Sequence, residues 1–232
     1  MIGSEVKEVR MLDYFTQIVY TVGKIEKGVI HMLGTGFLVD NGQYVVVPRH
    51  VVGDNDIGLC VIPPTLGSFD EYQDTTIDKA LHWSVKIEKS DSFRDVVLLS
   101  LVDVPIKGIL PTPLIGSTDD VFVGEDIYVI GFPHCVEGRQ VLTLQKAMIG
   151  AKILIENFGI KSKYCVINTQ TRPGQSGSML YSVSKNKIVG MLMGAFTADS
   201  CISLGGVNPR ELHQTTQCLS AEYIQKMIGG SV

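Results

Sequence analysis

Short apolar runs rich in Val and Ile recur along the whole chain and constrain its fold more than any other feature. Gly, Asn, Asp and Pro separate these runs, and few stretches show a sustained helical period. This alternation is typical of all-β sandwiches and barrels. The twelve candidate strands are residues 17–25, 29–40, 43–50, 57–63, 82–90, 95–102, 125–133, 139–149, 151–158, 164–171, 178–183 and 187–196. Twelve strands suit two sheets better than one, so we expect two six-stranded antiparallel β-barrels.

A connector divides these strands into two groups of six. Residues 105–120, PIKGILPTPLIGSTDD, hold three prolines and two glycines without a clear period, as inter-domain segments do. We therefore expect an N-terminal barrel in residues 1–104 and a C-terminal barrel in residues 121–232. Near the end, AEYIQKMI predicts a short C-terminal helix that Ser220 caps and Gly229 stops.

Composition and charge exclude several classes of function. With 45% hydrophobic and 19% charged residues, the chain has the composition of a globular protein. Its net charge of −4 and its scattered Lys and Arg argue against binding to nucleic acid or to an anionic membrane. No apolar run approaches the roughly 18 to 20 residues of a membrane span, and the N-terminus lacks the apolar run of a signal peptide. We expect a cytoplasmic protein, and the oligomeric state stays open.

The cysteines predict no cross-links and no metal site. There are five of them, and no pair has the C-x-x-C spacing: Cys60, Cys135, Cys165, Cys201 and Cys218. An odd number of widely spaced cysteines indicates free thiols, mostly buried, in a reducing compartment.

Two other segments have plain structural interpretations. Residues 63–80 form the longest polar insertion and predict an exposed loop. The alternative is an acidic rim that recruits basic segments of a substrate. The triplet Gly34-Thr35-Gly36 indicates strand geometry rather than a phosphate-binding loop.

The motif that most suggests chemistry is Gly174-Gln175-Ser176-Gly177-Ser178, with a serine between glycines. A nucleophilic serine needs a base to take its proton, an acid to orient that base, and N–H donors for the oxyanion. The nucleophile elbow of α/β-hydrolases requires Gly-x-Ser-x-Gly between a strand and a helix. Here Ser178 occupies the last position and the following residues predict a hairpin, which excludes that elbow.

Candidate partners for this serine lie in the first half of the chain. His50 ends the predicted strand QYVVVPRH, at a strand-to-loop junction where a side chain can face a cleft. Asp95 opens the apolar strand DVVLLSL, where a carboxylate needs a hydrogen-bonded or cationic partner. Asp91 is a competing acid, but its polar neighbours predict solvent exposure. The alternative for Asp95 is a strand cap or an ion pair with Arg94.

The order His50, Asp95, Ser176 carries further information. It is the chymotrypsin order, and it differs from the orders of subtilisin and the α/β-hydrolases. Because His50 and Asp95 fall in the first half and Ser176 in the second, the order predicts a cleft between two barrels.

Four motifs in matching order resemble the trypsin-like (chymotrypsin-fold) serine peptidases, over roughly residues 15–230. They are GTGFLVDNGQYVVVPRHVV, DVVLLSL, VGEDIYVIGFP and PGQSGSML with the later KIVGMLMG. The nearest branches are the HtrA/Deg and glutamyl-endopeptidase groups. The resemblance implies a serine endopeptidase that acts on polypeptides through an acyl-enzyme intermediate and needs no cofactor and no metal.

The same resemblance implies a role for each matching residue. Ser176 would attack the scissile carbonyl, His50 would act as general base and then acid, and Asp95 would fix the tautomer of the imidazole. The N–H groups of Gly174 and Ser176 would form the oxyanion hole, and Gly174 can adopt backbone conformations closed to other residues.

Three positions depart from the family pattern. Gln175 stands where members activated by cleavage carry an aspartate, so we expect a site that is competent as synthesised. Val47 stands where a threonine or similar residue is usual. Met193 stands where many members have a serine that contacts the catalytic aspartate, so the surroundings of Asp95 are left open.

The resemblance also places a primary substrate pocket. It would be lined by Gln170, Thr171, Met193, Gly194 and Ala195. No acid lies at its base, which disfavours specificity for Lys or Arg, and no histidine lies in the strand where glutamyl-specific relatives hold one. An apolar or small pocket is expected. The alternatives to an endopeptidase are a protease-like binding or scaffold module with a closed or partner-activated cleft, and an esterase with the same residues.

Overall fold

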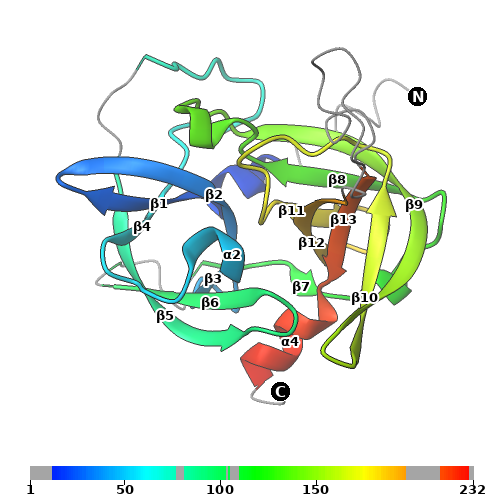
Figure 1. Ribbon diagram of the computed structural model, residues 1–232. Helices are drawn as coiled ribbons and strands as arrows, with labels where there is room; N and C mark the ends of the chain where they lie inside the picture. The colour runs from blue at the N-terminus through cyan, green and yellow to red at the C-terminus, as the bar shows by residue number, and fades with distance from the viewer. Residues whose placement is uncertain (1–11, 77–80, 103, 105–109, 197–214, 230–232) are drawn as a thin grey trace, which may run out of the picture.

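Two closed six-stranded barrels form the molecule (Figure 1). The computed structural model describes residues 12–76, 81–102, 104, 110–196 and 215–229. The predicted all-β class, with two antiparallel barrels and a short C-terminal helix, is confirmed.

The first barrel closes in the order β1-β2-β3-β6-β5-β4. The 3-10 helix η1 (Asp13–Gln17) precedes its strands, which are β1 (Val19–Glu26), β2 (Val29–Val39), β3 (Tyr44–Pro48), β4 (Leu59–Ile62), β5 (Trp83–Asp91) and β6 (Val96–Leu101). A single-turn helix, α2 (Arg49–Val52), follows β3. Every residue of β6 is buried, as its continuous run of Val and Leu requires of a strand covered on both faces.

The second barrel closes where β11 pairs with both β8 and β12. Its elements are η2 (Thr118–Asp120), β8 (Asp126–Gly131), η3 (Cys135–Glu137), β9 (Thr143–Asn157), β10 (Ile160–Ile167), β11 (Met179–Ser182), β12 (Lys187–Phe196) and β13 (Thr215–Ser220). The expected connector, 105–120, contains β7 (Leu114–Ile115), which pairs in parallel with β12.

Two strand assignments differ from those expected. The predicted strands 139–149 and 151–158 both fall largely in the one long strand β9, which runs from Thr143 to Asn157. Up to Met148 this strand pairs with β8, and from Ile149 it pairs with β10, so Gly150 lies at a shift of register inside the strand rather than at a turn. The sixth strand of this barrel is β13, which was not predicted.

The C-terminal helix α4 (Glu222–Gly229) buries Tyr223, Ile224 and Met227. The expected cap is wrong, because Ser220 belongs to β13 and its hydroxyl accepts the Thr118 N–H at 3.0 Å. Its oxygen therefore holds η2 rather than the start of α4.

The described part of the chain contains no helix that is long and apolar enough to cross a membrane. In the same residues, no group of three or more His, Cys, Asp and Glu side chains is arranged to hold a metal ion. Cys60, Cys135, Cys165 and Cys218 are free and buried as predicted, and Cys201 lies outside the described residues.

Candidate active site

His50 lies in the helical turn α2, one residue past its start, and not at the end of a strand as expected. Pro48 ends β3 and takes the extended conformation that precedes the helix. The backbone N–H of His50 donates to Asp95 Oδ1 at 2.8 Å, and the ring Nδ1 is hydrogen bonded to Asp95 Oδ2. The two residues are thus joined at both the backbone and the side chain.

Asp95 occupies the turn between β5 and β6 and precedes β6 rather than opening it. Its φ of 60° is in the left-handed region, where Asp is one of the few residues commonly found. Its carbonyl accepts the Arg49 N–H at 2.9 Å. The loop that carries the acid is therefore bound to the helix that carries the histidine by backbone and side chain alike.

Asp91, the competing acid, neither bonds to His50 nor lies exposed to solvent as expected. It is buried rather than exposed, and its carboxylate accepts the N–H groups of Phe93 and Arg94 at 3.0 and 3.1 Å. The Arg94 guanidinium donates to Asp91 Oδ2 at 2.7 Å, so the ion pair considered for Asp95 is made by Asp91. These bonds shape the turn that presents Asp95.

Ser176 is half-buried in the loop between β10 and β11. Its carbonyl accepts the Thr35 N–H from β2 at 2.9 Å, and its hydroxyl donates to the Met193 carbonyl at 3.1 Å rather than to His50. A Cβ added to Gly34 would lie 2.9 Å from a Val51 methyl carbon and 3.0 Å from the Ser176 carbonyl oxygen. Since Val51 is the next residue after His50, β2 lies tightly between the histidine helix and the serine loop.

On either side of Gln175, the N–H groups of Gly174 and Ser176 have no hydrogen-bond acceptor among the described residues. The Pro173 carbonyl accepts the His134 N–H at 2.6 Å. In a trans peptide the C=O and the following N–H point in opposite directions, so the Gly174 N–H is turned away from His134. Gly174 has φ +87°, and a Cβ there would lie 2.6 Å from Cys135 Sγ, so only glycine fits.

Thr35 is the functional residue that the sequence analysis missed. It is fully buried, and its hydroxyl donates to the Gly174 carbonyl at 2.9 Å while accepting the Phe132 N–H at 3.0 Å. Together with its N–H bond to Ser176, this side chain ties the first barrel to both flanks of the serine loop. As predicted, Gly34-Thr35-Gly36 lies in a strand, β2. The two glycines beside Thr35 are the signal in the sequence that another segment can approach this strand closely.

Gln175 is buried and fully bonded. Its side-chain carbonyl accepts the Arg172 N–H at 2.7 Å, and its amide nitrogen donates to Gln145 Oε1 at 2.7 Å. A neutral amide with both ends satisfied stabilises the turn before Ser176 without a charged partner.

The structure brings only some of the expected substrate-pocket residues together. Thr171 Oγ1 is hydrogen bonded to Thr216 Oγ1 of β13 at 2.7 Å, and Gly194 and Ala195 pair in register with β13. Gln170 is exposed. Met193 contributes the carbonyl that holds the Ser176 hydroxyl.

Burial raises the pKa of two groups near the site, Cys135 and Tyr164. It raises the pKa of the Cys135 thiol to about 12, so this thiol beside Gly174 stays protonated at neutral pH. Burial, with the nearby negative charge of Asp95, raises the pKa of Tyr164 to about 12. Tyr164 therefore stands near Asp95 as a neutral phenol.

Comparison with known proteins agrees with this fold. A family model described as "Trypsin-like peptidase domain" matches residues 34–191, and the chain belongs to this family. Magnetosome formation protease MamE of Paramagnetospirillum magneticum is 24% identical over 177 residues, 75% of this chain and 21% of MamE. The chain thus spans about a fifth of the length of that curated relative.

Solved structures share the fold at low identity. The active form of Rv3671c protease from M. tuberculosis has a TM-score of 0.65 and 21% identity, covering 97% of this chain and 85% of that one. Its inactive form has a TM-score of 0.61 and 19% identity, with 97% and 94% covered. The MamO protease domain from Magnetospirillum magneticum has a TM-score of 0.65 and 14% identity, with 92% and 97% covered.

Proposed function

We propose that this trypsin-like peptidase domain is a serine endopeptidase with His50, Asp95 and Ser176 as its catalytic triad. The observation that carries the proposal is the double hydrogen bond between His50 and Asp95. With Nδ1–H donated to the carboxylate, Nε2 is left unprotonated and can accept a proton, which is the state a general base needs.

The chemistry follows from these groups. Ser176 Oγ attacks the scissile carbonyl as His50 Nε2 takes its proton, and the N–H groups of Gly174 and Ser176 bind the oxyanion. His50 then gives that proton to the leaving amine, which departs and leaves an acyl-enzyme. Water, deprotonated by His50, attacks the acyl carbon, the bond from that carbon to Ser176 Oγ breaks, and His50 returns the proton to Oγ as the acid product leaves.

The Ser176 hydroxyl has one step to make before attack. The proposed mechanism requires a change of rotamer about χ1 that moves this hydroxyl from the Met193 carbonyl to His50 Nε2. Catalytic hydrogen bonds are often loose in unliganded sites and tighten when substrate binds.

The bonds of Gln175 support a site that needs no cleavage for activation. Its amide satisfies Arg172 and Gln145 within the chain, so no new N-terminal ammonium is required to hold this turn. An uncut chain is therefore expected to be active.

A second candidate is a protease-like binding module whose cleft a partner activates. It is favoured by the one feature that the endopeptidase has to change, the bond from the Ser176 hydroxyl to Met193. The unpartnered N–H groups of Gly174 and Ser176 favour the enzyme, because a scaffold has no use for free donors beside a serine.

Labelling with a fluorophosphonate probe separates the two candidates. The wild-type chain should react covalently, Ser176→Ala should not react, and Ser178→Ala, at a buried serine two residues away, should still react. In a peptide-cleavage assay Ser176→Ala should lower kcat by about 10⁶, as loss of the nucleophile does in serine proteases. Folded wild-type protein that shows no Ser176-dependent labelling would favour the binding module.

A further inference from the structure

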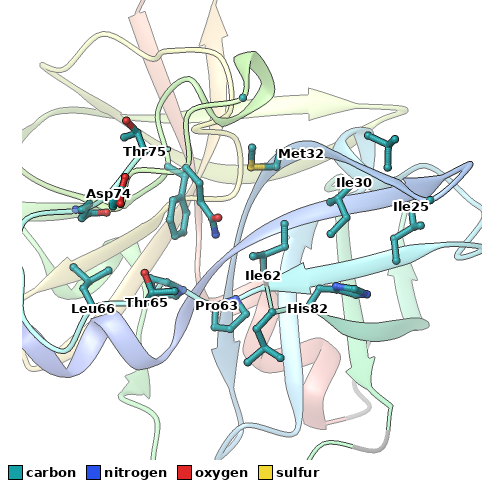
Figure 2. Close-up of a pocket in the computed structure, with 18 residues that line it drawn as sticks. Ile25, Ile30, Met32, Ile62, Pro63, Thr65, Leu66, Asp74, Thr75 and His82 are labelled. Atoms are coloured by element: carbon teal, nitrogen blue, oxygen red, sulfur yellow. The ribbon is translucent and has the colours of Figure 1, made fainter. Parts of the chain in front are cut away.

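A cavity of about 770 Å³ lies outside the triad, between the β1–β2 hairpin, the chain around β4 and the second barrel (Figure 2). Its apolar lining includes Ile30, Met32, Ile62, Leu66, Leu81 and Phe132. Figure 2 shows Ile25 and Asp74 at opposite ends of the cavity, with Ile62 and Pro63 between them. Its volume is within the range of pockets that bind specific ligands.

The cavity is connected to the serine loop through two shared elements. Phe132 lines it, and the Phe132 N–H donates to the Thr35 hydroxyl that holds Gly174. Strand β2 bonds to Ser176 at Thr35 and lines the cavity with Met32 and Ile30. At about 3.3 Å per residue, these two side chains lie roughly 10 and 17 Å along the strand from Thr35.

The same part of β2 has an unpaired edge. β2 pairs with β1 along its length but with β3 only from Phe37 to Val39. Within the residues that the structure describes, no second strand pairs with residues 29–34. An extended peptide can add to such an edge through main-chain hydrogen bonds and place alternate side chains in a pocket.

One end of the cavity is acidic. Asp74 lines it, Asp70 and Glu71 are exposed on the same segment, and none of the three forms an ion pair with a cation of the described residues. The Thr76 hydroxyl and N–H donate to Asp74 at 2.7 and 2.8 Å, and these bonds lower the pKa of Asp74. The rim is therefore negative at neutral pH.

This acidic segment is fastened to the second barrel. The Gln73 side chain donates to the Leu142 carbonyl and accepts the Leu142 N–H, both at 2.8 Å. A rim held at two points keeps its charge in place beside the apolar walls.

We propose that the cavity binds the part of a polypeptide substrate that follows the scissile bond. An apolar side chain enters between β2 and Ile62, and a neighbouring Lys or Arg pairs with the acidic rim. The inference rests on the proposed function. In that function His50 of the first barrel gives its proton to the leaving amine, so the segment after the scissile bond should begin on the side of the first barrel. From the spacing along β2, the bound segment extends about four or more residues past the scissile bond.

Paired substrates test this site. One fluorogenic peptide ends one residue after the cleaved bond, a second continues for eight residues that include Leu followed by Lys, and a third carries the same eight residues on the other side. Leu81→Asp and Asp74→Lys alter the cavity, and Leu154→Asp is the control because Leu81 and Leu154 are both 64% exposed. Leu81→Asp should lower kcat/KM at least 10-fold for the second peptide through KM, and Asp74→Lys several-fold. Both variants should match wild type on the other two peptides.

Equal effects on all three peptides, no effect on the second, or an effect confined to the third would each overturn the proposal. Binding of the second peptide to Ser176→Ala, followed by fluorescence anisotropy, separates this inference from the catalytic one. If the wild-type chain is not labelled by the fluorophosphonate but Leu81→Asp lowers the affinity of Ser176→Ala for the second peptide, the binding site is retained and the endopeptidase is rejected. If the wild-type chain is labelled and that affinity does not depend on Leu81, the endopeptidase is retained and the binding site is rejected.

Discussion

The two barrels contribute to the site in different ways. The first barrel supplies His50 from the helical turn α2 and Asp95 from the β5–β6 turn, and Asp95 accepts hydrogen bonds from the backbone N–H and the ring of His50. The second barrel supplies Ser176 in a glycine-rich loop that is held in part from outside, by Thr35 of the first barrel. The acid–base pair is assembled within one barrel, whereas the serine loop depends on the contact between barrels.

Because of this difference, a substitution at Asp95 should affect mainly catalysis, whereas one at Thr35 should also affect the packing between the barrels. The Asp95 side chain is 34% exposed, so a change there alters the histidine without opening the core. Thr35 is fully buried, so a change there leaves polar groups unpaired at the junction. The predictions below use this contrast.

Of the substitutions that probe this comparison, Asp95→Asn should produce the largest effect. An amide can still accept the His50 N–H, but it no longer selects the tautomer that leaves Nε2 free, and kcat should fall about 10⁴-fold. The melting temperature should stay near that of wild type. Steady-state cleavage and thermal unfolding measure the two quantities, and a loss of less than tenfold would contradict the triad assignment.

Thr35→Val should produce the next effect, on the other side of the comparison. It removes the hydroxyl that binds the Phe132 N–H and the Gly174 carbonyl, and leaves that carbonyl only the Cys135 thiol at 3.7 Å, so the loop that presents the Gly174 N–H is held less firmly. We expect kcat to fall about 10²-fold, the effect of losing one oxyanion donor.

The matched variant is Thr35→Ser, which keeps the hydroxyl and should recover most of the activity. The shape of the pH profile of kcat/KM should be the same in all three proteins. A shifted pH profile would mean that the acid–base pair also depends on the contact between barrels.

Lys163→Met should produce the smallest effect, at a surface ion pair that contributes no group to the proposed triad or to the serine loop. The hydrogen bond to Asp119, with help from Glu222, raises the pKa of Lys163 above its ordinary value of 10.5. Because the folded pKa is raised, the stabilisation is complete below pH 10.5 and is lost as pH rises through the folded pKa. With the Lys163 side chain 40% exposed, we expect a loss of about 0.2–1 kcal/mol.

Urea unfolding at pH 7 and again above the folded pKa checks this sign. The difference between Lys163→Met and wild type should be present at pH 7 and absent at the higher pH. Activity on peptides should not change, and a larger loss at high pH would contradict the assignment of the ion pair.

Much of the fold could be predicted from local pattern. Short Val- and Ile-rich runs determine strands because β-branched side chains favour extended backbone, and turn residues mark where each run ends. The strand β13 was missed because TTQCLS is short and polar at its start, and the long β9 was divided at Gly150. The total of twelve barrel strands was right because these two errors offset each other.

By itself the sequence determined the fold class, the order His50, Asp95, Ser176 and the glycine that frees an N–H beside the serine. Those features depend on residue type and on order along the chain. Only the tertiary structure decided that Asp91 is buried against Arg94, that Thr35 holds the serine loop and that a cavity lies along β2. Each of these joins side chains through contacts that spacing along the chain does not encode, since burial and hydrogen bonding depend on how the barrels pack.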